Sequence, residues 1–210
     1  MKQRQTTYVR KRRVVRNGVL TVLLLAAVLW LSGYTFSREA GIHALEVRLG
    51  IGKTETIREI QLGTGVTRSI RENEYCLLDC DIKFQPGEGW SAGGTAIDIP
   101  AGSGFGAACD QYTDDENNAT YYAVGYANDP QISAIHMEIW EVKGAEPERI
   151  SQGEAQFLQG RYNRCFLIEI PLVQERPVFN EVRFTLLSAD GDVLQEIMME
   201  RDGKLEGVTL

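Results

Sequence analysis

Residues 89–93 (GWSAG) match the G-x-S-x-G pattern, in which a sharp turn between a strand and a helix exposes a nucleophilic serine, here Ser91. Such a serine needs a histidine base, and His136 is the one histidine that follows it in the sequence. The flanking residues do not fit, because residues 85–88 (QPGE) predict a turn and residues 94–98 (GTAID) predict a strand in place of the helix. We therefore interpret residues 89–93 as a glycine-rich turn and predict no catalytic residue.

Residues 114–118 (DDENN) carry side-chain oxygens of the kind that bind calcium, but they lack the spaced D-x-[DN]-x-[DN]-G pattern. They predict a solvated connection between strands. Neither His43 nor His136 stands at zinc-ligand spacing from other ligands. The glycines of residues 50–54 and 102–106 have neither the spacing nor the following helix of a phosphate-binding loop. The sequence thus predicts no metal site and no cofactor.

Four cysteines are the remaining reactive side chains: Cys76, Cys80, Cys109 and Cys165. Cys76 and Cys80 fall in one predicted strand, where four residues at ~3.3 Å each place them ~13 Å apart, beyond the ~7 Å Cα limit of a disulfide. A bridge from either would have to reach Cys109 or Cys165. The alternative is that all four are buried thiols in the core. Both alternatives stay open at this point.

The elements that must position these residues have the period of β structure. Residues 75–84 show it best, because Cys76, Leu78, Cys80, Ile82 and Phe84 alternate with polar side chains that would form the other face. Further strands are predicted at residues 54–62, 92–99, 105–111, 120–126, 135–140, 162–170, 181–187 and 193–199. An Asp-Gly turn joins the last two. Eight or nine short antiparallel strands with one polar face each predict a mainly β fold for residues 53–210, an antiparallel β-sandwich or a closed barrel.

A short helix is predicted just before the first strand, in the segment 37–52. Ser37 can cap it, and Ile42, Leu45 and Leu49 recur at helical spacing. Gly50 then ends it. Because no linker of Pro, Gly and Ser follows, we expect this juxtamembrane helix to pack on the β domain.

The N-terminus has the composition of a membrane anchor. Residues 18–36 are uncharged and about as long as the ~20 residues that a helix needs to cross a bilayer, and Trp30 and Tyr34 lie near their outer end. Residues 1–17 hold seven Lys or Arg and no acidic residue, which predicts a cytoplasmic tail and an exported C-terminal part. A cleaved signal peptide is the alternative. It fits less well, because the apolar run exceeds a typical h-region and no A-x-A site follows.

The exported part is strongly acidic. The whole chain has 22 basic and 29 acidic residues, and without the seven N-terminal cations 15 basic residues remain against 29 acidic ones, a net charge of −14. This charge disfavours nucleic acid and anionic polymers as partners.

Six short segments of the second half resemble the C-terminal β domain of uncharacterised Gram-positive surface proteins that are anchored by one helix or a lipid. These segments are residues 121–126 (YYAVGY), 129–132 (DPQI), 135–137 (IHM), 161–167 (RYNRCFL), 182–184 (VRF) and 189–193 (ADGDV). Residues 44–46 (ALE) and 50–54 (GIGKT) are similar to the helix-to-strand entry of those proteins. The resemblance implies an extracytoplasmic β-sandwich and a Gram-positive host, and it implies no activity.

The sequence therefore predicts a single-pass protein of the cell membrane, with its N-terminus in the cytoplasm and a non-catalytic binding or assembly module outside. Its partners would be the membrane and an unidentified protein or other envelope component. One alternative is a structural subunit of a membrane complex. The other is an enzyme, either a serine hydrolase using Ser91 or a metal-dependent activity on the loop that begins at Asp114.

Overall fold

The described part of the chain forms two helices and thirteen strands in this computed structural model. It comprises residues 2–31, 33–63, 65–114, 118–143, 146–172, 181–200 and 203–209. The helices are α1 (Lys2–Leu31) and α2 (Arg38–Leu49). The strands are β1 (Glu55–Gly63), β2 (Val66–Glu72), β3 (Cys76–Gln85), β4 (Gly89–Asp98), β5 (Phe105–Thr113), β6 (Ala119–Ala127), β7 (Ala134–Lys143), β8 (Glu146–Glu154), β9 (Gln156–Gln159), β10 (Arg164–Leu172), β11 (Glu181–Leu187), β12 (Val193–Glu200) and β13 (Lys204–Val208).

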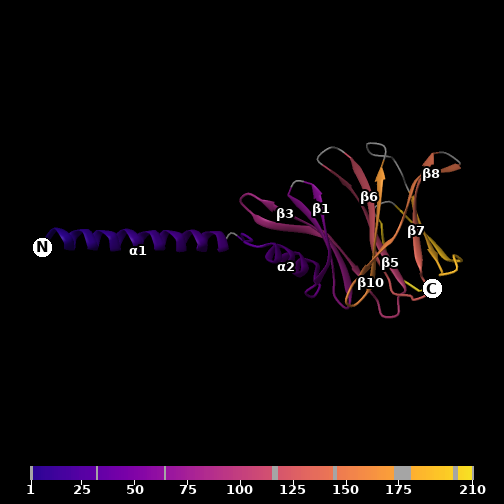
Figure 1. Cartoon of the computed structure of the whole chain (residues 1–210), viewed down its shortest axis with the longest axis horizontal. Helices are drawn as coiled ribbons and strands as arrows, with labels where there is room; N and C mark the ends of the chain where they lie inside the picture. The colour runs from indigo at the N-terminus through magenta and orange to yellow at the C-terminus, as the bar shows by residue number, and fades with distance from the viewer. Residues whose placement is uncertain are drawn as a thin grey trace.

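The strands form three antiparallel sheets that stack face to face. Sheet A has the order β1-β2-β3-β4, sheet B the order β13-β5-β6-β10-β9, and sheet C the order β12-β11-β7-β8. Helix α2 covers the outer face of sheet A, sheet B lies in the middle, and sheet C forms the far side (Figure 1). The prediction of a mainly antiparallel β fold with packed sheets is confirmed. The third sheet is an addition that the sequence interpretation did not contain.

Sheet B is apolar on both faces because a sheet covers each of them. In β6, Tyr121 and Ala123 face sheet C, whereas Tyr122, Val124 and Tyr126 face sheet A, and all five are buried. A strand covered on both sides has no polar face to alternate with its apolar one. This explains the nearly continuous apolar run of residues 119–127 and accounts for two separate cores on the two sides of sheet B.

Helix α2 has the limits that the sequence predicts. The Ser37 hydroxyl accepts a hydrogen bond from Ala40 N at 3.1 Å, and Ile51 N donates to Glu46 O at 3.0 Å to close the C-terminus after Gly50. Ile42 and Leu45 pack on sheet A. A Cβ at Gly41 would lie 2.7 Å from Trp90 O, so glycine is required where the helix approaches the backbone of β4.

A buried polar network fixes the same helix to sheet A. The carboxylate of Glu46 accepts hydrogen bonds from Thr54 N at 2.7 Å and Thr54 Oγ1 at 2.6 Å. Arg71, on β2, donates to Thr54 Oγ1 at 3.0 Å and Thr54 O at 2.9 Å, and it pairs with Glu39 at 3.3 Å. The predicted packing of this helix on the β domain is thereby confirmed.

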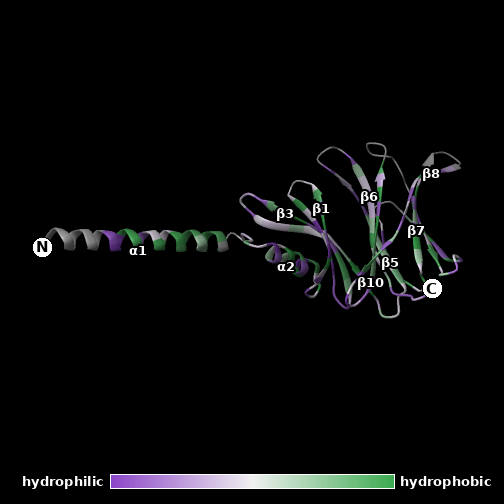
Figure 2. Ribbon diagram, viewed as in Figure 1, coloured by the Kyte–Doolittle hydropathy of each residue, from purple (hydrophilic) through white to green (hydrophobic). Residues whose placement is uncertain are grey.

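Helix α1 projects away from the β domain, and its second half carries apolar side chains (Figure 2). Leu23, Leu24 and Val28 are 60, 66 and 60% exposed. Within the residues that the structure describes, neither helix reaches the combination of length and apolar character needed to cross a membrane.

Sheets A and B are joined at one end by the carboxylate of Glu72, the last residue of β2. This side chain is buried and accepts hydrogen bonds from the backbone N–H groups of Arg161, Tyr162 and Asn163, the last two at 3.1 and 3.0 Å. Asn163 Nδ2 adds a further bond at 3.1 Å. The turn between β9 and β10 therefore closes around one charge that comes from the neighbouring sheet. We call this contact the Glu72 clasp.

Replacing Glu72 by alanine should strongly destabilise the protein. The substitution leaves several buried donors without an acceptor, and hydrogen bonds to a charged group contribute ~1.5–3 kcal/mol each. We expect the free energy of unfolding in urea to fall by at least ~3 kcal/mol. Glu74→Ala, two residues away and exposed, should change it by less than ~0.5 kcal/mol. Equal effects of the two substitutions would contradict the clasp.

Candidate functional site

The residues proposed for a serine hydrolase lie in different layers of the molecule. Ser91 lies within β4 of sheet A, so the interpretation of residues 89–93 as a turn is wrong, and the turn is confined to residues 86–88. The Ser91 hydroxyl lies 3.5 Å from Lys83 O. His136 lies on β7 of sheet C, with Nε2 3.4 Å from Glu154 Oε1. Sheet B separates the two side chains, so this geometry does not form a catalytic pair.

The acidic loop is closed at its base by its own first and last residues. The Asp114 carboxylate accepts hydrogen bonds from Asn118 N at 2.8 Å and Asn118 Nδ2 at 3.0 Å. Residues 115–117, which carry the rest of the predicted loop, lie outside the described residues. Within the described ranges, no group of three or more His, Cys, Asp and Glu side chains is placed to hold a metal ion.

The four cysteines occupy three different layers. Cys76 and Cys80 lie on the face of sheet A that α2 covers, and Cys165 lies between sheets A and B. All three are free and buried. Cys109 lies between sheets B and C, with Sγ 3.8 Å from Met199 Sδ. Because a sheet lies between each of these layers, the structure favours buried thiols at Cys76, Cys80 and Cys165 over a bridge.

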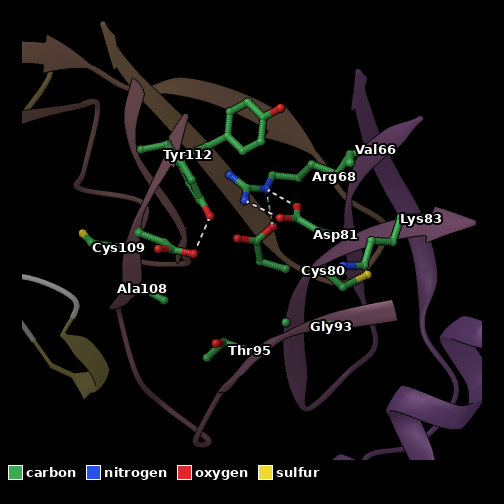
Figure 3. Close-up of a pocket in the computed structure, with 14 residues that line it drawn as sticks. Val66, Arg68, Cys80, Asp81, Lys83, Gly93, Thr95, Ala108, Cys109 and Tyr112 are labelled. Carbon is green, nitrogen blue, oxygen red and sulfur yellow. Dashed lines mark hydrogen bonds and ion pairs between the residues drawn. The ribbon is translucent and has the colours of Figure 1, made fainter. Parts of the chain in front are cut away.

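A cleft between sheets A and B, which we call the A/B cleft, has a volume of about 560 Å³. The two sheets are held together at the Glu72 clasp and diverge toward their other end (Figure 1). The chemistry of the cleft comes from three side chains of sheet A and three of sheet B. These are Arg68, Asp79 and Asp81, and Asp110, Tyr112 and Tyr122 (Figure 3).

Arg68 is the centre of this group. It lies opposite Asp81 in the pairing of β2 with β3 and donates to both carboxylate oxygens of Asp81, at 2.9 and 3.1 Å. Its Nε lies 3.5 Å from Asp79 Oδ1, and its Cζ lies 3.5 Å from the centre of the Tyr122 ring. Burial by itself lowers the pKa of Arg68, but Asp79, Tyr122 and Asp81 raise it, and the net direction is upward. The guanidinium is thus a fixed cation whose partners come from both sheets.

Asp79 has an unusual environment for a carboxylate. Its side chain is only 12% exposed, and within the described residues its buried Oδ1 accepts no hydrogen bond. Burial raises the pKa of Asp79 to about 7, with a smaller upward effect from Asp81 and Asp110 and an opposing effect from Arg68. The sequence predicted a polar face on β3, opposite Cys76, Leu78 and Cys80. Asp79 lies on that face, but it is buried and faces the A/B cleft rather than solvent.

The sheet B side of the cleft is built around Tyr122. Its hydroxyl donates to Asp110 Oδ2 at 2.9 Å, across the β5–β6 pair. Burial raises the pKa of Tyr122 above its ordinary value, and Asp79 adds to the effect, so the phenol stays protonated. The lining has three carboxyl groups, of which Asp79 holds its proton up to about pH 7, against Arg68, which is already paired, and Lys83. Asp79 Oδ1, which accepts no hydrogen bond, suits a ligand group that can donate one, either polar neutral or cationic.

Sequence reasoning did not find this cleft. Its charged side chains come from β2, β3 and β5, which have no fixed spacing from one another in the chain. The available signal was Arg68 itself, because an arginine in the middle of a strand needs a carboxylate partner on the adjacent strand.

Neither a known protein family, nor a curated protein, nor a solved structure matches this chain.

Asp79→Asn should alter the pH dependence of stability. Between pH ~4 and ~7 the unfolded chain loses the Asp79 proton while the folded protein keeps it, so stability falls as pH rises and levels off above about 7. Asparagine does not titrate, so Asp79→Asn removes this pH-dependent loss of stability. Each pKa unit corresponds to ~1.4 kcal/mol. Between pH ~4 and ~7, the free energy of unfolding in urea should therefore rise by at least ~2 kcal/mol in the variant relative to the wild type.

The matched control for this measurement is Asp192→Asn, in the exposed turn before β12. It should leave the shape of the pH profile unchanged. Parallel profiles for Asp79→Asn and the wild type would contradict the assigned environment of Asp79.

Cys76, Cys80 and Cys165 should resist labelling in the folded protein. Burial raises the pKa of Cys76 to about 11 and that of Cys80 to about 12, and it raises the pKa of Cys165 as well. We expect maleimide to modify none of the three at pH 7.5, and all three after unfolding without reductant. Peptide mapping by mass spectrometry identifies the labelled sites. A peptide that stays unlabelled after unfolding would indicate a disulfide.

Proposed function

We propose that this protein is a membrane-anchored module that displays its β domain outside the cytoplasm of a Gram-positive cell. There it would bind or assemble with an envelope component, without catalysis. The observation that carries this proposal is the apolar half of α1. The helix is continuous to Leu31, and the large apolar side chains of its second half are exposed.

An exposed helix of this kind is unfavourable in water. Val19, Leu25 and Leu31 are 53, 59 and 78% exposed, and a helix that is apolar all round is typical of a protein core or a membrane. Residues 14–31, at ~1.5 Å per residue, extend ~27 Å, close to the ~30 Å of a hydrocarbon layer. Arg16 is their one charged residue and can reach the headgroups. The apolar run of the sequence continues to Phe36 through Ser32, which is outside the described residues.

The connection between α1 and the β domain also supports display rather than loose tethering. Thr35 pairs with Gly89 as an isolated parallel bridge, and α2 begins at Arg38 and is fixed to sheet A by Arg71 and Glu46. A module held this close to its anchor is suited to binding at the membrane surface. The A/B cleft is the hollow where we expect a polar neutral or cationic ligand group to enter.

The support for a non-catalytic role is the separation of Ser91 from His136 by a whole sheet. A structural subunit of a larger membrane complex remains the alternative within the same topology. In that case chemical crosslinking in intact membranes would join most of the protein to one partner in a fixed ratio, and the A/B cleft would be dispensable for that contact.

Topology is the decisive test of the proposal. Alkaline phosphatase, which is active only outside the cytoplasm, should be active when fused after Leu210, and the protein should resist carbonate extraction from membranes. Replacing Leu24 and Leu25 together by arginine, at ~2.5–3.5 kcal/mol each, should abolish both results. The matched control, with valine at both positions, should behave as the wild type. An inactive phosphatase in the wild-type fusion, or a mature N-terminus beyond Phe36, would overturn the proposal.

A further inference from the structure

The chain leaves α1 and at once joins the hairpin between β3 and β4. Tyr34 N donates to Leu29 O at 3.0 Å and so closes the C-terminus of α1, just after Gly33 in the left-handed conformation. Thr35 N then donates to Glu88 O at 3.2 Å, and Thr35 O accepts from Trp90 N at 3.0 Å. A Cβ at Gly89 would lie 2.1 Å from Thr35 O, so only glycine allows this contact. The hairpin is therefore fixed beside the end of the helix.

Four aromatic side chains gather at this junction, and we call them the aromatic collar: Tyr34, Phe36, Phe84 and Trp90. The rings of Tyr34 and Phe36 lie 4.8 Å apart, and those of Phe84 and Trp90 lie 5.7 Å apart in an edge-to-face arrangement. Phe36 is 59% exposed and Phe84 is 50% exposed. Tyr34 and Trp90 are half-buried, and Trp90 also packs against the core beneath α2, whereas the rings of Phe36 and Phe84 project from the domain.

The short connection between α1 and Thr35 limits how far the aromatic collar can lie from the end of the helix. Thr35 lies four positions after Leu31, the last helical residue, and an extended chain spans at most ~3.6 Å per residue. The headgroup region on each side of the hydrocarbon is ~5–7 Å thick. In Figure 1 the β3–β4 hairpin is the part of the β domain that extends furthest toward α1. If α1 crosses the bilayer, the hairpin lies at the bilayer surface.

We propose that the aromatic collar inserts into the lipid–water interface of the membrane that α1 crosses and so holds the β domain in one orientation. This inference rests on the proposed membrane anchor. Aromatic rings favour that interface, because one part of the ring system meets hydrocarbon while polar edges stay hydrated. Lys83, next to Phe84 in the sequence, adds a cation that suits lipid phosphates. Arg38, whose Cζ lies 5.8 Å from the Trp90 ring centre, is already paired with Glu59 at 3.0 Å.

Lys83 also lines the A/B cleft, so the collar fixes the position of the cleft relative to the membrane. In this orientation the cleft lies beside the lipid surface, where a membrane-bound ligand can reach it.

The three tryptophans of the chain allow both proposals to be tested in one experiment. Trp30 lies in α1, Trp90 in the collar, and Trp140 on β7 of sheet C. Full-length variants that keep one tryptophan each, with phenylalanine at the other two positions, are placed in phosphatidylcholine vesicles. The vesicles contain lipids brominated near the headgroup or near the bilayer centre, and bromine quenches nearby tryptophan fluorescence.

Trp90 should be quenched at least twofold more than Trp140, and more by shallow than by deep bromines, while Trp30 should also be quenched. Quenching of Trp30 without quenching of Trp90 would overturn the collar and leave the membrane anchor standing. Absence of quenching at Trp30 would overturn the anchor and the collar together.

A second pair of variants tests the collar without touching Trp90. Phe36→Ser with Phe84→Ser changes only exposed rings, so near-ultraviolet circular dichroism should show a folded domain, and the quenching of Trp90 should fall at least twofold. Val193→Ser with Met198→Ser, at positions 57 and 63% exposed on β12, is the matched control and should leave quenching unchanged. Equal quenching in the two double variants would overturn the collar.

Discussion

Strand β2 buries three charged side chains, and the arrangement of the layers depends on how each charge is satisfied. Arg68, Arg71 and Glu72 are 4, 3 and 1% exposed. A buried charge without partners costs several kcal/mol, so each must find fixed partners on a neighbouring element. Arg71 finds them under α2, whereas Arg68 and Glu72 find them toward sheet B. One strand of seven residues thereby ties sheet A to the layers on both of its sides.

The positions of these three charges along β2 also explain why a cleft exists. Glu72, at the end of the strand, is enclosed by the turn of residues 160–163, which holds the two sheets together there. Arg68 lies four residues earlier, where its partners are side chains rather than backbone N–H groups. Asp81 lies on sheet A itself, so the Tyr122 ring is the partner that the long Arg68 side chain reaches across the gap to sheet B. The sheets therefore separate toward this end, and the space between them is lined with the groups that satisfy Arg68.

The sequence predicted those parts of the fold that depend on local pattern. Period two in residues 76–84 placed Cys76, Leu78 and Cys80 together under α2, and Ser37 and Gly50 marked the ends of that helix. Strand β2 was missed because VTRSIRE has no apolar alternation, its charges being buried by pairing. The A/B cleft was missed for the same reason. A local pattern reports which side chains avoid water, and it does not report which distant charge compensates a buried one.

The layers are connected in series from α1 outward. Thr35 and α2 join α1 to sheet A, sheet A packs on sheet B through apolar side chains of all four of its strands, and among the described residues sheet C packs on sheet B. The A/B cleft lies at the joint between the anchored sheet and the two sheets beyond it. A ligand that enters the cleft therefore contacts Asp79 on the anchored side and Asp110 on the far side. If α1 and the aromatic collar hold sheet A at a membrane, as proposed, a ligand in the cleft would contact both the sheet held there and the sheet beyond it.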